Sequence, residues 1–359
     1  MGKRKKITTR DIAEYTGLSQ STVSMILSHK ENVSFSKETQ DIVLQAAKKL
    51  GYKNEIHKSK SSQKDLHQTI VVIAPHLSNS YYATLIHSIV YEAKKHNYSV
   101  FTITTMRNAQ QEDSYYELLS NLDLAGIIYL YPPTKISKAN ALFKRMPVVS
   151  IGDKPQGSRF DSVELNGVRA GHLMGEYLLN LGHEKITFIS APVMGKEISR
   201  IHRYEGLIHA FEDQGKDVQN IQLKTMSLAQ YESIQTENIE YQVGYELTME
   251  ALEEGTDSTA FLANNDMTAL GVLSALKSEG YKVPKDFSVA GFDNILMSSL
   301  PDISLTTIEH ATFLKGKEAV DIIYKKHLKN NAQKSHPYIL RLEYEPELII
   351  RKTTGKPRK

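Results

Sequence analysis

The side chains that could do chemistry in this chain point to binding rather than to catalysis. The 359 residues include no cysteine, which excludes disulfides, thiolate metal sites and cysteine nucleophiles. The sequence has no GxxxxGK[ST], no GxGxxG and no HExxH, and His183-Glu184 lacks the second histidine of a zinc motif. Serines and histidines abound, yet none has the sequence context of an activated nucleophile. We therefore expect no catalytic residue, no metal and no cofactor.

Positive charge is concentrated in the N-terminal part of the chain. Residues 1–66 hold 13 of the 44 lysines and arginines but only 7 of the 41 acidic residues, a net charge of +6. The remainder carries a net charge of −3. This asymmetry indicates a polyanionic partner for the basic segment, with a solvated tail as the alternative.

The apolar segments indicate where the protein works. No apolar h-region follows the basic N-terminus, and runs such as 70–74 are too short to span a bilayer. The sequence therefore predicts a cytoplasmic protein without a membrane partner.

Three short helices must position any side chains that the basic segment uses. Thr8-Thr9-Arg10-Asp11 is a helix start, and Gly17 ends that helix. Ser19 can cap a second helix over 20–27, whose apolar residues share one face. A third helix beginning near Ser36 carries Ile42, Val43, Ala46 and Leu50 at helical spacing. Two short helices joined by a glycine turn, with a third closing the core, are typical of a helix-turn-helix.

The rest of the chain divides into a polar linker and a large α/β body. Residues 53–67 are rich in lysine and serine, as linkers are. From Gln68 onward, apolar strand-like runs such as TIVVIAP, AGIIYLY and KITFISA alternate with helical patterns. This alternation predicts parallel sheets covered by helices, in two α/β lobes, with ligands beyond the carboxyl ends of the strands.

A set of ordered motifs resembles the lactose-repressor/galactose-repressor family of bacterial transcription regulators. The similarity runs from about Ile7 to Thr354. Its landmarks are TTRDIAEYTGLSQSTVSMIL, LGY (50–52), NSYY (79–82), LGHEKITFIS (181–190), SRIHRYEG (199–206), NNDMTALGVLSAL (264–276), VPKDFSVAGFDN (283–294), LTTI (305–308) and PELIIRKTT (346–354).

The resemblance implies a function and a division into domains. We expect a helix-turn-helix head over 1–52, a hinge over 53–67 and a periplasmic-binding-protein-like α/β effector domain over 68–359. Lobe one is expected over 68–163 and 309–330, and lobe two over 164–308 and 331–355. Family members are usually homodimers that read a pseudo-palindromic double-stranded DNA operator. A small effector between the lobes, often a sugar, shifts DNA affinity. Repression is the commoner mode, and a co-regulator protein is left open.

The resemblance also assigns the DNA-reading residues. Base readout in the major groove falls to Gln20, Ser21 and Met25. Expected phosphate contacts are Thr9, Ser19, Thr22, Ser24, Ser28 and Tyr52. The alternative for the small polar residues is helix capping and solvent exposure.

Two departures from the family pattern affect the expected operator. Met25 stands where most members have arginine, so it offers apolar contact rather than a bidentate guanine contact. Ser61 stands where a leucine usually wedges into the minor groove, so the linker has two alternatives, a hinge helix that kinks the DNA and a flexible tether. The linker lysines can still neutralise phosphates.

By position, the family's cleft residues in this chain are His76, Asn79, Tyr81, Tyr82, Asn166, Arg200, Asn265 and Asp293. Arg200 and Asp293 are the expected polar pair, with a plain salt bridge as the alternative. Tyr81 and Tyr82 could instead belong to the core or to a dimer interface. Asp266 is expected to cap a helix, and Arg203 to face away from the cleft. Ile239 stands where relatives often carry an aromatic residue.

Two rival functions share the body fold. An extracytoplasmic sugar-binding protein would carry a signal peptide where this chain has its DNA-reading module. A sugar kinase or a dehydrogenase would carry one of the motifs excluded above. The sequence therefore favours a ligand-responsive DNA-binding regulator, not an enzyme.

Overall fold

The computed structural model describes residues 7–27, 35–50, 52, 66–153, 156–192, 198–234, 236, 238–332 and 338–358. The chain separates into two compact units, 1–66 and 67–359. The division falls next to the predicted end of the linker. Among the described residues, no helix combines the length and the apolar character needed to cross a membrane.

Three helices lie between residues 7 and 50 in the described part of the first unit. They are α1 (Thr9–Thr16), α2 (Gln20–Leu27) and α3 (Lys37–Leu50). Thr8 and Asp11 form a reciprocal capping box at the start of α1, and Gly17 ends the helix with φ of 70°, a left-handed conformation that suits glycine. The predicted start and end of the first helix are thus confirmed.

A small apolar core holds the three helices together. It consists of the buried residues Ile12, Ala13, Val23, Ile26, Leu27, Val43, Ala46 and Ala47. Tyr52 packs against this cluster from outside α3. Ile42, predicted on the apolar face of the third helix, is instead 47% exposed, because Val43 takes the inward position.

Lobe one is built on a six-stranded parallel sheet in the order β11-β5-β4-β3-β1-β2. Its strands are β1 (Thr69–Ala74), β2 (Ser99–Thr104), β3 (Gly126–Tyr129), β4 (Val148–Ile151), β5 (Asp161–Leu165) and β11 (Arg341–Tyr344). The chain starts in β1, adds the edge strand β2 on one side, and then returns to add β3, β4 and β5 in turn on the other side. Such a switch point leaves a crevice beyond the carboxyl ends of the strands.

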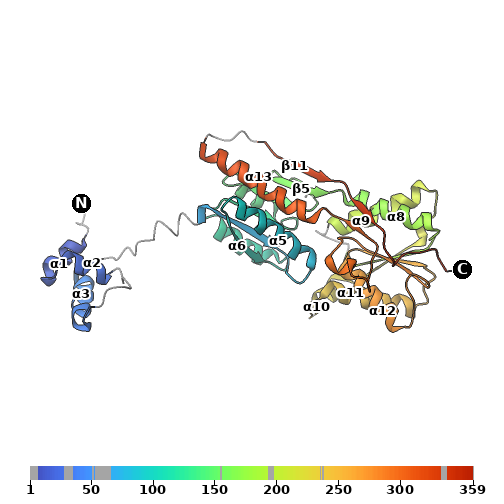
Figure 1. Cartoon of the computed structure of the whole chain (residues 1–359), viewed down its shortest axis with the longest axis horizontal. Coiled ribbons are helices and arrows are strands. Elements are labelled where there is room, and N and C mark those ends of the chain that lie inside the picture. Colours follow the sequence, from blue (N-terminus) through green and yellow to red (C-terminus); the bar gives the residue numbers. More distant parts are fainter. Residues whose placement is uncertain are drawn as a thin grey trace. The chain divides into compact units, whose positions relative to one another are not determined.

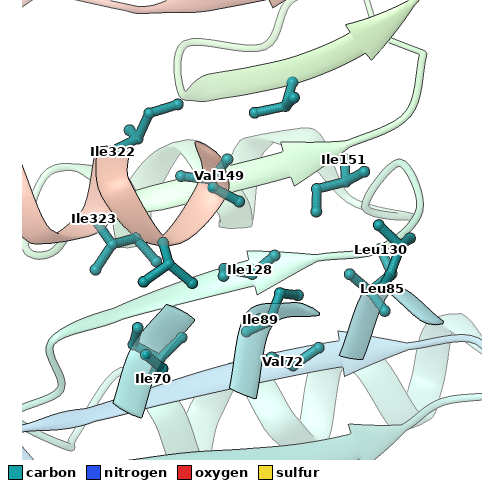
Figure 2. Close-up of a cluster of buried hydrophobic side chains, with 14 of the residues drawn as sticks. Ile70, Val72, Leu85, Ile89, Ile128, Leu130, Val149, Ile151, Ile322 and Ile323 are labelled. Atoms are coloured by element: carbon teal, nitrogen blue, oxygen red, sulfur yellow. The ribbon is translucent and has the colours of Figure 1, made fainter. Parts of the chain in front are cut away.

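Helices cover both faces of this sheet. They are α5 (Ser80–Lys95), α6 (Ala109–Leu119), α7 (Ile136–Phe143) and α13 (Thr312–Ala332). On one face, Leu85 and Ile89 of α5 and Ile323 of α13 pack on strand residues such as Val72 and Ile128 (Figure 2). On the other face, Leu119 of α6 and Leu142 of α7 do the same. The inner strands β1, β3 and β4 are therefore buried on both faces, as in other parallel sheets.

Lobe two is built on a four-stranded parallel sheet in the order β7-β6-β8-β9. Its strands are β6 (Ile186–Ser190), β7 (Ile221–Thr225), β8 (Ala260–Ala263) and β9 (Ser288–Ala290). The α-helices are α8 (Gly167–Leu181), α9 (Ile198–Asp213), α10 (Leu228–Ser233), α11 (Ile239–Glu253) and α12 (Asp266–Ser278). Short 3-10 helices span Val218–Asn220 and Leu296–Ser299. The predicted two-lobed α/β class is confirmed.

The lobe boundaries differ from the prediction near the C-terminus. Residues 331–355 were expected in lobe two, yet β11 pairs with β5 in the sheet of lobe one (Figure 1). Only the following β12 (Glu347–Ile349) joins β10 (Thr307–Glu309) in a separate antiparallel pair. The last stretch of chain thus runs from one lobe to the other.

The alternation of strand-like and helical sequence patterns did not predict several elements of the body, among them α7, β5, β7, α11 and α13.

Candidate functional site

Helix α2 presents a polar face opposite its core face. Val23, Ile26 and Leu27 are buried. Gln20, Ser21 and Ser24 are exposed, and Met25 is half-buried beside them. An exposed polar face on the second helix of a helix-turn-helix is the one that can enter a major groove.

The predicted phosphate-contacting residues of the first unit differ in their local contacts. Ser19 caps α2, since its Oγ accepts from the backbone N–H of Thr22 at 3.1 Å. Thr9 Oγ1 accepts from Gln20 Nε2 at 3.4 Å, which links the starts of α1 and α2. Tyr52 is half-buried against the core. Ser28, Ser61 and the linker lysines lie outside the described residues.

A cleft lies where the carboxyl ends of the strands of both lobes meet. The lobe-one lining is Asn79, Tyr81, Tyr82, Arg107, Leu130, Tyr131, Pro132, Ile151 and Gly152. The lobe-two lining is Ser199, Arg200, Arg203, Glu240, Asn264, Asn265 and Asp293. The cavity in this cleft has a volume of only about 80 Å³. Ligand pockets usually measure roughly 300–1,000 Å³, so this cleft is closed.

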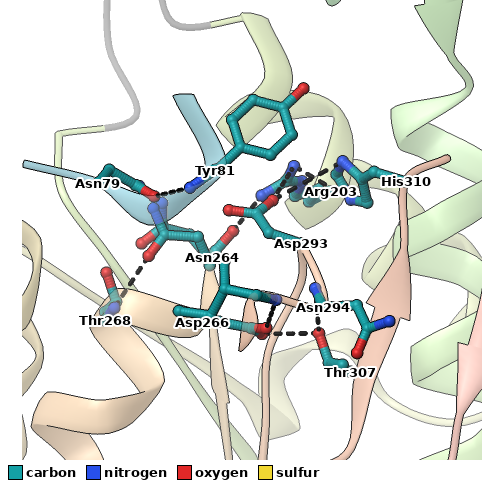
Figure 3. Close-up of polar contacts among 12 residues, drawn as sticks. Asn79, Tyr81, Arg203, Asn264, Asp266, Thr268, Asp293, Asn294, Thr307 and His310 are labelled. Atoms are coloured by element: carbon teal, nitrogen blue, oxygen red, sulfur yellow. Dashed lines mark hydrogen bonds and ion pairs between the residues drawn. The ribbon is translucent and has the colours of Figure 1, made fainter. Parts of the chain in front are cut away.

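A buried ionic network forms the lobe-two side of the cleft. Arg203 Nη2 lies 3.2 Å from Asp293 Oδ1 and 3.4 Å from His310 Nε2, and Arg203 Nη1 donates to the carbonyl of Asn264 (Figure 3). Burial raises the pKa of the Asp293 carboxyl, and the Arg203 guanidinium acts against that rise. Burial, with the charges of Arg203 and Lys315, lowers the pKa of His310 well below its usual value. His310 is therefore a neutral neighbour of the Arg203–Asp293 ion pair.

The expectation that Arg203 faces away from the cleft is wrong. Arg200 and Arg203 are three residues apart on α9 and lie on the same side of it, as i,i+3 neighbours do. Both line the cleft, but Arg203 is the partner of Asp293. Arg200 Nη1 donates to the carbonyl of Pro192 at 3.3 Å, and its guanidinium lies 5.6 Å from the centroid of the Tyr231 ring.

Glu240 joins the two lobes across the cleft. One carboxylate oxygen accepts from Asn79 Nδ2 at 2.5 Å, and the other accepts from Asn265 Nδ2 at 3.0 Å. Asn79 caps α5 in lobe one and Asn265 caps α12 in lobe two. Glu240 was not among the predicted cleft residues, although it directly follows Ile239.

A second bridge lies nearby. His202 Nδ1 of α9 is 2.8 Å from Asp153 Oδ1, just beyond β4. The hydrogen bond to Asp153 raises the pKa of His202, against the effect of its partial burial. Burial acts to raise the pKa of Asp153, but hydrogen bonds from His202 and Ser199 outweigh it and lower that pKa. Both partners therefore favour their charged forms.

The tyrosines of the cleft are held by cations. Lys315 Nζ donates to the hydroxyl of Tyr81 at 3.0 Å, and Arg107 Nη2 donates to that of Tyr82 at 2.9 Å. The Arg107 guanidinium also lies 5.2 Å from the centroid of the Tyr131 ring. Arg107 and Tyr131 were absent from the predicted set. The strand ends alone would have suggested Tyr131, which follows β3 by two residues.

Two predicted cleft residues and one predicted cap lie elsewhere. His76 is not among the lining residues, and its ring centroid lies 5.4 Å from that of Tyr82. Asn166 caps α8 and donates to Glu343 at 3.2 Å, outside the lining. Asp266 is framework, as expected, but Asn265 caps α12. The Asp266 carboxylate instead accepts from Ser298, Thr307 and the backbone of Ile295.

The fold and the cleft agree with the comparisons with known proteins. Residues 67–343 match the model of periplasmic binding proteins and the sugar-binding domain of the LacI family, and residues 8–55 match that of bacterial regulatory proteins of the lacI family. The HTH-type transcriptional repressor PurR of Mannheimia succiniciproducens is 28% identical over 351 residues, which cover 97% of this chain and 99% of that repressor.

Solved structures show the same architecture. A LacI-family regulator from Silicibacter pomeroyi has a TM-score of 0.66 at 26% identity, covering 97% of this chain and 99% of that one. A LacI-family regulator from Enterococcus faecium with bound ribose has a TM-score of 0.67 at 23% identity, covering 80% of this chain and 99% of that one. This chain, with its helix-turn-helix and its two-lobed cleft, therefore belongs to the LacI family of bacterial DNA-binding transcription regulators.

Proposed function

We propose that this protein is an effector-gated repressor that binds a pseudo-palindromic operator as a homodimer. The observation that carries the proposal is one chain with two sites: an exposed polar face on α2 and a cleft of charged and amide side chains between two lobes. DNA is read by the first site, and a small molecule controls the protein through the second.

The direct contacts with DNA are proposed for the polar face of α2. Gln20 pairs with adenine, Ser21 contacts a neighbouring base edge and Met25 packs against a thymine methyl group. Thr9, Ser19, Thr22, Ser24, Ser28 and Tyr52 contact phosphates and set the register. Two heads related by twofold symmetry would read two inverted half-sites, which is why a homodimer is part of the proposal.

The effector is proposed to be a small polar molecule that carries hydroxyl groups, such as a sugar or a related metabolite. Arg203, Asp293 and Asn265 offer both donors and acceptors, and the rings of Tyr81 and Tyr82 offer apolar faces. A sugar needs more room than the closed cavity offers, so binding must move the lobes apart. Gating then requires that the effector bind the two lobe arrangements with different affinities.

The test is selection of operators from random DNA by the full-length protein, repeated with a panel of metabolites. The proposal predicts an inverted repeat whose enrichment changes with one class of polar metabolite. Selection of a sequence without twofold symmetry would contradict the homodimeric reader. An operator that no metabolite affects would contradict the gating.

The proposal includes the location and the chemistry of the protein. It acts in the cytoplasm, where the operator is, and it catalyses no reaction. The cleft offers charged and amide groups for binding, and the sequence carries none of the catalytic motifs sought above. A turnover screen on free and phosphorylated sugars should find no catalysis. Robust product formation would contradict this part of the proposal.

A further inference from the structure

Three potential metal ligands meet where α5 packs against α13, away from the effector cleft. They are Glu92 on α5, His96 at the C-cap of α5 and Asp321 on α13. His96 Nε2 lies 3.3 Å from Asp321 Oδ1 and 3.8 Å from Glu92 Oε1, and one ligand atom from each residue lies within 4.8 Å of the other two. Glu92 is buried, with 5% exposure, and the other two side chains are about one-fifth exposed.

The helices hold these side chains in a fixed arrangement. Ser88, Glu92 and His96 follow each other at four-residue spacing and so lie on one face of α5. Gly316 of α13 packs so closely on this face that an added Cβ would lie 1.7 Å from Ser88 Oγ. The crossing of the two helices is therefore tight, which places Asp321 beside the two ligands of α5.

The imidazole ring is oriented as well. His96 stacks on Tyr324 with ring centroids 3.9 Å apart and an interplanar angle of 24°. This stacking holds the ring so that Nε2 faces the two carboxylates. Lys95 occupies the other oxygen of Glu92, with Nζ 2.7 Å from Oε2, which leaves Oε1 directed at the site. The last turn of α5 also favours a cation, because the carbonyl end of a helix is negative.

We propose that Glu92, His96 and Asp321 bind a divalent first-row transition metal ion such as Zn²⁺. With metal–ligand bonds of about 2.1 Å, neighbouring ligand atoms of a tetrahedral site lie about 3.4 Å apart. The two distances from His96 Nε2 bracket this value. One imidazole and two carboxylates suit such ions, and three protein ligands leave a coordination position open to solvent or to a further ligand.

A plain ion-pair cluster is the competing explanation, in which His96 contacts the two carboxylates and no metal ion binds. The two explanations differ in the affinity of these three side chains for an added metal ion. Metal ligation uses a neutral imidazole and ionised carboxylates, so metal affinity falls in acid. A plain ion-pair cluster would show no metal affinity that depends on these three side chains.

The experiment is calorimetric titration of the tag-free full-length protein with Zn²⁺. The variants are His96→Gln and Asp321→Asn, and His87→Gln is the control because His87 is an exposed histidine of α5. The proposal predicts one strong equivalent per chain in the wild type and in His87→Gln. It predicts binding at least tenfold weaker in both site variants.

Substitution with Co²⁺ gives a second readout, since its visible absorption reports coordination by imidazole and carboxylate. That spectrum should disappear in His96→Gln and persist in His87→Gln. Circular dichroism checks that each variant is folded. If His96→Gln does not fold, Asp321→Asn, which keeps the side-chain volume, tests the proposal in its place. Either equal Zn²⁺ binding in the wild type and both site variants or no binding at micromolar Zn²⁺ would overturn the proposal.

Discussion

Gln20 is the residue on which the proposed base readout can be tested most directly. It begins α2, is exposed, and reaches Thr9 at the start of α1 through its side-chain amide. An amide that pairs with adenine discriminates against the wrong base by about 1–3 kcal/mol.

Gln20→Ala should therefore relax specificity at one position of each half-site while leaving the helical content unchanged. Operator selection and competition binding measure this effect. Gln45→Ala, at an exposed position of α3, is the control and should leave specificity intact. Uniform weakening on all sequences would instead assign Gln20 a phosphate contact.

Arg203 compensates a buried charge and lines the cleft at the same time. Removing one partner of a buried ion pair leaves the other charge without compensation, which costs about 3–5 kcal/mol. Arg203→Ala should lower the free energy of unfolding by about this amount, because Asp293 remains buried. Urea denaturation gives the value.

The exposed Arg169→Ala on α8 is the matched control and should change stability by less than about 0.5 kcal/mol. A double variant, Arg203→Ala with Asp293→Asn, should regain part of the lost stability, because the uncompensated carboxylate is gone. Equal losses in the single and the double variant would show that the ion pair does not account for the effect.

At the scale of elements, α11 is joined to α5 and α12 through Glu240. Both carboxylate oxygens accept hydrogen bonds, so Glu240→Gln would turn an amide N–H₂ toward one of the two asparagine amides. The resulting unpaired donors should destabilise the closed arrangement by about 1–3 kcal/mol.

Small-angle scattering of the free protein should then show a larger fraction of open lobes in Glu240→Gln. Glu253→Gln, at an exposed position of the same helix, should scatter like the wild type. Unchanged scattering in Glu240→Gln would mean that this bridge does not hold the lobes together.

The bridge between α9 and the loop after β4 should depend on pH. The pKa of His202 is raised in the folded protein, so its contribution to stability is fully present below the unfolded-state value of about 6.5. It is lost as the pH rises through the higher folded-state value. The pKa of Asp153 is lowered, so its contribution is lost in acid, as the pH falls through the folded-state value.

The stability difference between wild type and His202→Gln should therefore shrink as the pH rises from 6 to 8. Urea denaturation across this range measures it. His172→Gln tests a histidine of the same lobe that pairs with Asp213 rather than with lobe one. A difference that grows with pH would contradict the assigned charge state.

At the scale of the whole molecule, the two compact units correspond to two functions. A chain of residues 67–359 should fold by itself, because its cores are complete within that range. We expect it to bind effector with the affinity of the full chain and to shift no DNA. Sequence-specific DNA binding by this truncated chain would refute the assignment of DNA reading to α2.

The sequence by itself determined the features that depend on interactions between residues close together in the chain. Caps such as Thr8 and Ser19, the glycine that ends α1, and the apolar spacing of α2 act within a few residues, so local patterns predict them. Alternating strand and helix patterns likewise indicated parallel sheets, because strands buried on both faces are continuously apolar. The resemblance to the family likewise rested on short motifs that occur along the chain in the family's order.

Only the tertiary structure decided which polar side chains meet. The partner of Asp293 is Arg203, because the orientation of α9 against β9 sets which arginine reaches the carboxylate. The role of Glu240 depends on its hydrogen bonds to Asn79 and Asn265, which come from different lobes and are far from it in sequence. Likewise, β11 joins lobe one through hydrogen bonds to a strand about 180 residues earlier. Contacts at such separations depend on packing, which local patterns do not record.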